Sequence, residues 1–64
     1  MNAVEKIKEL HGQIDILSEF EKSFVTDNFA RVEKWSDDTR FSEKQAALID
    51  RIYKERVEEG KAAA

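Results

Sequence analysis

The chain has 64 residues, no cysteine and a single histidine, which leaves room for one small domain without disulfides or an ordinary zinc site to support it. Its 11 basic and 14 acidic residues give a net charge of −3, whereas a dedicated nucleic-acid binder usually shows a basic excess. No apolar run approaches the ~18 residues of a membrane span, and the first residues lack the pattern of a secretory signal, so we expect a cytoplasmic protein with no membrane partner.

Three capping signals divide the chain. Asn2, Ser18 and Ser42 are each followed three residues later by Glu or Gln, a spacing that lets the two side chains satisfy each other's backbone N–H groups at a helix start. The chain has no proline and only two glycines, so little interrupts a helix between these starts. The sequence therefore predicts an all-α fold, a three-helix unit with helices at about 3–17, 19–35 and 43–59. They form a single domain over 1–60, and 61–64 is expected to fray.

The first predicted helix carries one narrow apolar seam. Its large apolar residues recur at steps of three and four, the spacing of one helix face: Val4, Ile7, Leu10, Ile14 and Leu17. His11 lies beside this seam, and Ile16 points roughly opposite it. Gly12 weakens the middle of the helix by up to ~1 kcal/mol relative to alanine, so a kink or fraying is expected there.

The second predicted helix has a much wider apolar face. This face covers roughly half of the helical circumference and consists of Phe20, Phe24, Val25, Phe29, Val32 and Trp35. Glu21, Asn28 and Arg31 fall inside the same arc. One neighbouring helix cannot cover a face this wide, so we expect this helix to contact two others, or one other and a second subunit.

Residues 36–41 form the predicted loop before the third helix, because Ser, Asp and Thr side chains compete with helical hydrogen bonds. Phe41 directly precedes the Ser42 cap, where an apolar residue can pack on the first helical turn. The third helix again has an apolar half-circumference, formed by Ala46, Leu48, Ile49, Ile52, Tyr53 and Val57. Gly60 is placed to end this helix, because glycine accepts the left-handed conformation.

No arrangement of side chains predicts catalysis, a cofactor or a metal ion. His11 has Asp15 one helical turn away, but these two ligands alone make a weak metal site. Asp37 and Asp38 are adjacent in a loop, so their carboxylates diverge and stay hydrated rather than share a dry pocket. We therefore predict no catalytic, cofactor-binding or metal-binding residue and no enzymatic activity.

The aromatic residues include the best candidates for a partner-binding surface, although as a group they are first predicted to form core. Trp35 and Phe41 flank the polar loop, and tryptophan is prominent at interface hot spots. Together with Phe29 and Ile16, they are the predicted partner-binding residues.

A nucleic-acid interface is the alternative, through Lys44, Arg51 and Lys54 on the outer side of the third helix. The second and third helices also invite comparison with a helix-turn-helix unit. Their connection of about seven residues is longer than the usual turn of three or four, and the third helix is charge-neutral. Direct binding to nucleic acid is therefore disfavoured.

Two residue patterns on either side of the predicted loop are familiar: Leu17-Ser18-x-x-Glu21-x-x-Phe24 and Phe41-Ser42-Glu43-Lys44-Gln45-x-x-Leu48-Ile49-x-x-Ile52-Tyr53. Together they resemble a short helical segment of phage and prophage proteins, which is also found appended to bacterial proteins of DNA metabolism. The matching positions are mostly caps and core residues, so the resemblance implies a fold and no particular binding residue. It also implies an accessory protein of phage type that acts near replication, recombination or host defence.

These observations favour a small non-enzymatic protein–protein interaction module, a phage-encoded accessory protein that binds and modulates a host or replication/recombination factor in the host cytoplasm. Two wide apolar faces in so short a chain also predict self-association as a homodimer. The competing arrangement is a compact monomer in which the second and third helices enclose the first. A purely structural subunit of a larger assembly is a further alternative.

Overall fold

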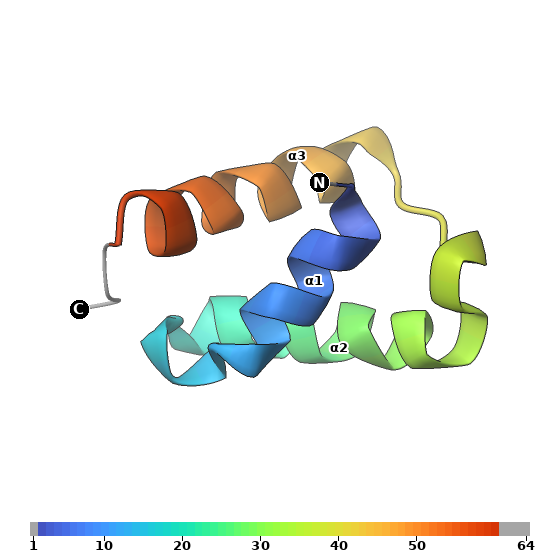
Figure 1. Cartoon of the computed structure of the whole chain (residues 1–64), viewed down its shortest axis with the longest axis horizontal. Helices are drawn as coiled ribbons and strands as arrows, with labels where there is room; N and C mark the ends of the chain where they lie inside the picture. Colours follow the sequence, from blue (N-terminus) through green and yellow to red (C-terminus); the bar gives the residue numbers. More distant parts are fainter. Residues whose placement is uncertain (1, 61–64) are drawn as a thin grey trace.

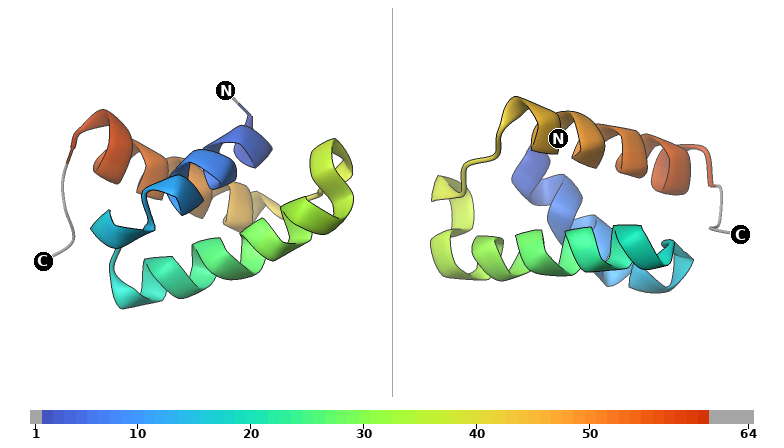
Figure 2. Two further views of the ribbon diagram at one scale, coloured as in Figure 1. Left: turned by 60° about the horizontal axis from the view of Figure 1, so that its bottom comes forward. Right: turned by 180° about the vertical axis from the view of Figure 1, so that it is seen from behind.

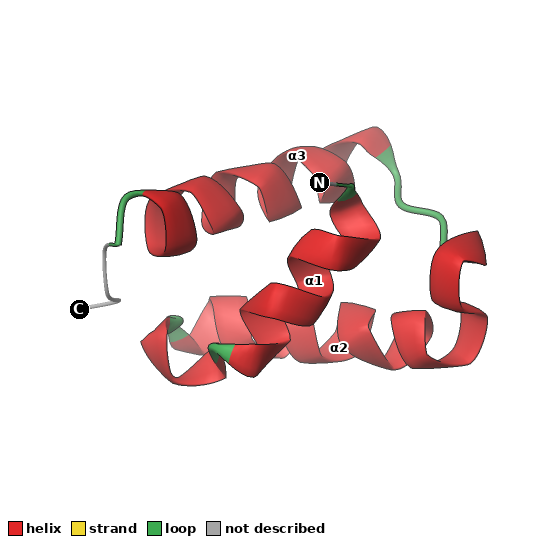
Figure 3. Ribbon diagram, in the orientation of Figure 1, coloured by secondary structure: helices red, strands yellow, loops and turns green. Residues whose placement is uncertain are grey.

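The computed structural model describes residues 2–60, which contain helices and connecting turns but no strand (Figures 1 and 3). The α-helices are α1 (Ala3–Gly12), α2 (Glu19–Trp35) and α3 (Glu43–Tyr53). Shorter helical turns follow each of them: η1 (Ile14–Ile16), η2 (Ser36–Asp38) and the π-helical η3 (Lys54–Glu58). The predicted all-α three-helix unit is confirmed, and the expected fraying of 61–64 lies outside the described residues.

All three predicted capping signals begin a helix. The Asn2 side chain accepts a hydrogen bond from the Glu5 backbone N–H at 2.9 Å. Ser18 and Ser42 each form a complete capping box, in which the serine and the Glu or Gln three residues later bond to each other's backbone N–H. Local hydrogen bonding that can be read from the sequence therefore sets where α1, α2 and α3 start.

The first helix is shorter than predicted, because α1 ends at Gly12 instead of continuing to residue 17. The Gln13 N–H bonds to the Leu10 carbonyl, three residues back, and the chain then tightens into the 3-10 turn η1. Glycine has low helix propensity, and a 3-10 turn uses three residues per revolution instead of 3.6. The tighter winding still buries Leu17 and brings Ile16, expected on the opposite side, against the core.

α1 lies across one face of the pair formed by α2 and α3, which run antiparallel to each other (Figures 1 and 2). Its apolar seam points between them, while Glu5 and Lys8 on its outer side stay exposed. The buried core joins residues of all three helices: Val4, Ile7, Leu10, Leu17, Val25, Val32, Ile49 and Ile52. α1 therefore packs against both neighbours without being enclosed by them.

Longer side chains connect α3 to its neighbours. On the α1 side, the Tyr53 hydroxyl donates to the Glu9 carboxylate at 3.1 Å, and the Lys6 ammonium pairs with Asp50 at 2.8 Å. The backbones of α2 and α3 stand too far apart for close helix-on-helix packing. The face of the α2–α3 pair that is turned away from α1 is therefore open to long side chains and to solvent.

The end of the third helix also differs from the prediction of a regular helix to residue 59. After Tyr53 the chain widens into η3, where the Glu59 N–H bonds to the Lys54 carbonyl five residues back. Arg56, four residues after Ile52, lies on the same side of the helix and reaches Glu21 of α2. Gly60 follows with φ of +68°, which agrees with its predicted role at the helix end.

Candidate protein-interaction surfaces

Two large apolar side chains are exposed within residues 2–60, and both belong to α2. Phe20 is 65% exposed near the start of the helix, and Trp35 is 54% exposed at its end. Fifteen helical steps separate them, or about 22 Å along the axis. An exposed aromatic ring contributes strongly to binding when a partner buries it, so each end of α2 is a candidate surface.

The position of Phe20 corrects the sequence prediction, which placed it in the core face of the second helix. The buried line along α2 instead runs through Glu21, Val25, Asn28 and Val32, a spacing of four, three and four. Two of these four residues are polar, and Phe20 lies about 100° around the helix from this line. The sequence prediction put all the apolar residues of the arc on one face, whereas the fold buries Glu21 and Asn28 within it and leaves Phe20 exposed.

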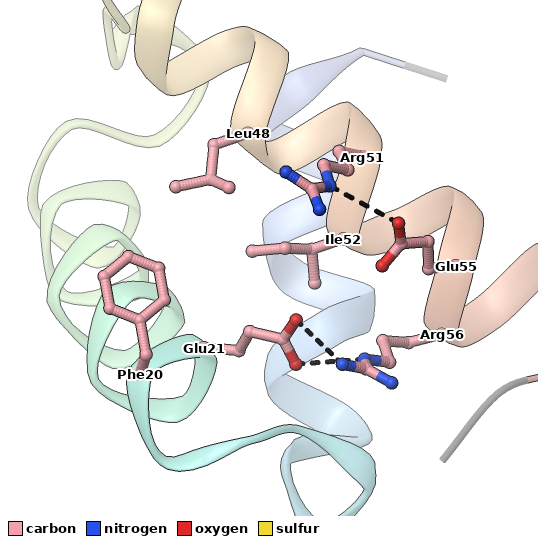
Figure 4. Close-up of a pocket in the computed structure, with 7 residues that line it drawn as sticks. All are labelled: Phe20, Glu21, Leu48, Arg51, Ile52, Glu55 and Arg56. Carbon is pink, nitrogen blue, oxygen red and sulfur yellow. Dashed lines mark hydrogen bonds and ion pairs between the residues drawn. The ribbon is translucent and has the colours of Figure 1, made fainter. Parts of the chain in front are cut away.

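A groove lies between the start of α2 and the later half of α3, with α1 behind it (Figure 4). Its volume is about 220 Å³, and it is lined by Phe20, Glu21, Leu48, Arg51, Ile52, Glu55 and Arg56. Leu48, which is half-buried, and the fully buried Ile52 form the apolar part of its wall, and the charged side chains form the rest. Phe20 stacks on Phe24 beside it, with ring centroids 6.3 Å apart. The first candidate surface is this α2–α3 groove.

A two-pronged ion pair closes one side of the groove. Arg56 Nε and Nη2 donate to the two carboxylate oxygens of Glu21 at 3.0 and 3.1 Å, and both side chains are largely buried (Figure 4). Glu21 also accepts from the Ser18 N–H in the capping box of α2. Burial alone would raise the pKa of Glu21, but the hydrogen bonds from Arg56 and Ser18 outweigh it, and the pKa lies below its ordinary value of 4.5.

The cationic residues predicted as a nucleic-acid surface lie on the outer side of α3 and η3. Lys44, Arg51 and Lys54 are all exposed. Arg51 pairs with Glu55 one turn along at 3.3 Å and is 74% exposed. This side of the helix therefore alternates in sign, which differs from the continuous basic stripe typical of phosphate binding.

The second candidate surface surrounds Trp35. The Lys34 ammonium lies 5.2 Å from the Trp35 ring centroid, and Trp35 is directly followed by Ser36, whose φ of 52° and ψ of −129° are rare for a residue with a side chain. The predicted loop is ordered into η2 at this point. The buried Thr39 hydroxyl donates to the Ser36 carbonyl at 2.7 Å, so the turn is tied back to the end of α2.

The other predicted partner-binding residues are half-buried and pack against the core. The Phe29 ring stacks on His11 with centroids 3.7 Å apart, and the Arg31 guanidinium lies 5.6 Å from the centroid of the Phe41 ring. Ile16 sits against the core in η1. Trp35 is therefore the one member of the predicted set that the fold leaves exposed.

The described residues carry neither a clustered metal site nor a membrane span. Nowhere in 2–60 do three or more His, Cys, Asp or Glu side chains gather closely enough to hold a metal ion. In the same part of the chain, no helix combines the length and apolar character needed to traverse a bilayer.

The fold and its surfaces define a small all-α unit with an exposed aromatic residue at each end of one helix. Comparisons with protein-family models, with curated proteins and with solved structures find no match to this chain.

Proposed function

We propose that this protein is a small non-enzymatic protein–protein interaction module, an accessory protein of phage type that binds and modulates a host or replication/recombination factor. The observation that carries the proposal is the exposed Trp35 side chain at the end of α2, directly before the ordered turn η2. Its phage character is supported by the resemblance of residues 17–53 to helical segments of phage and prophage proteins.

Tryptophan at this position suits a binding anchor for energetic reasons. Burying a large aromatic ring against a partner gives more binding free energy than most other contacts, and interface hot spots are rich in tryptophan. The backbone that carries Trp35 loses little additional freedom on binding, because it belongs to α2 and Thr39 holds the following turn. Exposed Lys34, Asp37 and Asp38 flank Trp35 in the sequence and supply charges of both signs near it.

The backbone at Ser36 gives a second, independent reason. A residue with a side chain at φ of 52° and ψ of −129° costs of order 1–3 kcal/mol, and such strain is concentrated at functional sites. Glycine would avoid the cost, yet serine stands here. The strained turn directs the chain away from α2 immediately after Trp35 and leaves the indole uncovered.

Affinity capture with matched variants tests the proposal. The bait is the full chain, incubated with bacterial host extract, and the variants are Trp35→Ser and Ala30→Ser, the second being an exposed position elsewhere on α2. We expect a protein that binds the native chain and Ala30→Ser but is lost with Trp35→Ser, and that binds again when purified. Circular dichroism checks that both variants fold. If no protein shows this dependence on Trp35, the proposal is wrong.

The nucleic-acid alternative is tested separately by fluorescence anisotropy with labelled single- and double-stranded DNA. Binding that falls steeply with salt, and that weakens when Lys44 and Lys54 are replaced by alanine, would favour the alternative. We expect no such binding, because Arg51 between them is paired with Glu55.

A further inference from the structure

We infer that two copies of this chain pair through the α2–α3 faces turned away from α1, and that Phe20 of each copy enters the groove of the other. This surface is separate from the Trp35 surface, and its occupant is a second copy of the same chain. Three observations support a second copy as the occupant: the volume of the groove, the balance of its charges, and the area of the α2–α3 face.

The groove can accept a phenyl ring. Its volume is about 220 Å³, and benzene occupies an apolar protein cavity of about 150 Å³. Leu48 and Ile52 supply apolar walls, while Phe20 projects beside them with most of its surface exposed. A two-fold axis across this face would place each Phe20 against the groove of the partner, so both exposed rings would be covered at once.

The groove carries equal numbers of positive and negative side chains, so it is not suited to a partner with charge of one sign. Its lining contains two arginines, Arg51 and Arg56, and two glutamates, Glu21 and Glu55. A pairing of identical patches requires self-complementarity, and a patch of a single sign would repel its copy. In antiparallel register, the exposed Arg51 of one copy can meet Glu55 of the other. A strongly charged partner would find no comparable match.

The size of the face is sufficient for a modest dimer. The Cα atoms span 32 by 17 Å in the plane of this face, or about 540 Å² before side chains are added. Stable interfaces bury roughly 600 Å² or more per partner. The α2–α3 face therefore reaches the required area only if most of it is used.

The arrangement also explains the wide apolar face of α2. One neighbouring helix cannot cover an apolar face that spans half of the circumference of α2. In the dimer, α1 covers one part of that face and the second copy covers the other part. In the dimer, α2 and α3 of both copies form the central layers, and the two α1 helices remain outside.

Sedimentation equilibrium over a concentration series through the micromolar range tests the pairing. We expect the native chain to approach twice 7.4 kDa as concentration rises. Phe20→Ser should stay at 7.4 kDa, whereas Trp35→Ser, the matched loss of an exposed aromatic residue on the same helix, should still form dimers. A native chain that is monomeric at every concentration overturns the inference, and so does a dimer that Phe20→Ser leaves intact.

Charge reversal tests the register of the pair. Arg51→Glu and Glu55→Arg each place like charges across the two-fold axis, so each variant alone should dimerise at least tenfold more weakly than the native chain. Mixing the two variants should restore a dimer that contains one copy of each. If the mixture stays monomeric while the native chain dimerises, the proposed contact between Arg51 and Glu55 is wrong.

The outcomes separate this inference from the proposed function. A monomeric native chain that still captures a protein through Trp35 overturns the pairing alone. A Phe20-dependent dimer that captures nothing overturns the proposed function alone. A native chain that is monomeric and binds another protein through Phe20 assigns the groove to a different partner.

Discussion

The two ends of α2 expose an aromatic residue for different physical reasons. At the start of the helix, Phe20 is exposed because the backbones of α2 and α3 stand apart, and the Glu21–Arg56 ion pair bridges them. At the end, Trp35 is exposed because the chain turns away at a strained Ser36, and the turn is held by hydrogen bonds from Thr39. The exposure of Phe20 depends on an ion pair, and the exposure of Trp35 depends on backbone geometry. Substitutions that remove charge should therefore affect the start of α2, and substitutions that relieve strain should affect its end.

The largest effect is expected from the ion pair at the start of α2. Replacing Arg56 with Met leaves the Glu21 carboxylate largely buried without its partner, and breaking such a pair costs about 3 kcal/mol or more. A chain this short rarely has more than about 3–5 kcal/mol of stability from its core, so this loss is a large part of the free energy of unfolding. Urea denaturation measures it.

The matched control for that measurement is Arg51→Ala, because Arg51 also pairs with a glutamate but is 74% exposed. Its loss should change the free energy of unfolding by less than about 0.5 kcal/mol. Adding Glu21→Gln to Arg56→Met should recover part of the lost stability, since no buried charge then remains. Equal effects of Arg56→Met and Arg51→Ala would show that the start of α2 does not depend on its ion pair.

A smaller effect of opposite sign is expected at the other end. Ser36→Gly should stabilise the fold by about 1 kcal/mol, because relief of the strain at φ of 52° exceeds the greater entropy of glycine in the unfolded chain. In a domain of this size that corresponds to a rise of roughly 4–8 °C in melting temperature. Ser36→Ala removes the hydroxyl but keeps the strain, so it should give no increase. A drop in melting temperature with Ser36→Gly would contradict the assignment of strain to this turn.

The smallest effect is a pH dependence confined to the start of α2. The pKa of Glu21 is lower in the folded state than its ordinary value of 4.5, so its stabilising contribution is complete above that value and is lost as pH falls through the folded pKa. The difference in stability between the native chain and Glu21→Gln should therefore shrink below about pH 4.5. The gain from Ser36→Gly should stay constant over the same range. If the free energies of unfolding of the native and Glu21→Gln proteins change in parallel with pH, this account of Glu21 is wrong.

Several features of the fold could be predicted from local sequence patterns. The caps at Asn2, Ser18 and Ser42 were correctly placed, because a helix start is decided by side chains within three residues of it. The positive φ of Gly60 was predicted for a similar reason. A kink or fraying was predicted at Gly12, where α1 ends, but the 3-10 turn that follows was not. That turn brings Ile16 against the core, whereas a continuous helix would have pointed it away.

The candidate surfaces were predicted only in part. Trp35 was identified from its place beside a polar loop, and it is exposed as a partner-binding residue would need to be. Phe20 was assigned to the core, because its hydropathy resembles that of Phe24 and Val25. The capping box already placed Glu21 at the third position of α2, but nothing in the spacing showed that Arg56, 35 residues later, would bury it.

The sequence by itself therefore determined the number of helices, where each begins and the all-α class, because those properties follow from hydrogen bonds and apolar spacing over a few residues. Only the tertiary structure decided which apolar residues are covered. That choice depends on how far apart α2 and α3 lie and on which long side chains bridge them, and both follow from α1 packing across the two helices. A buried ion pair between residues far apart in the chain thus leaves Phe20, and not Glu21, on the surface.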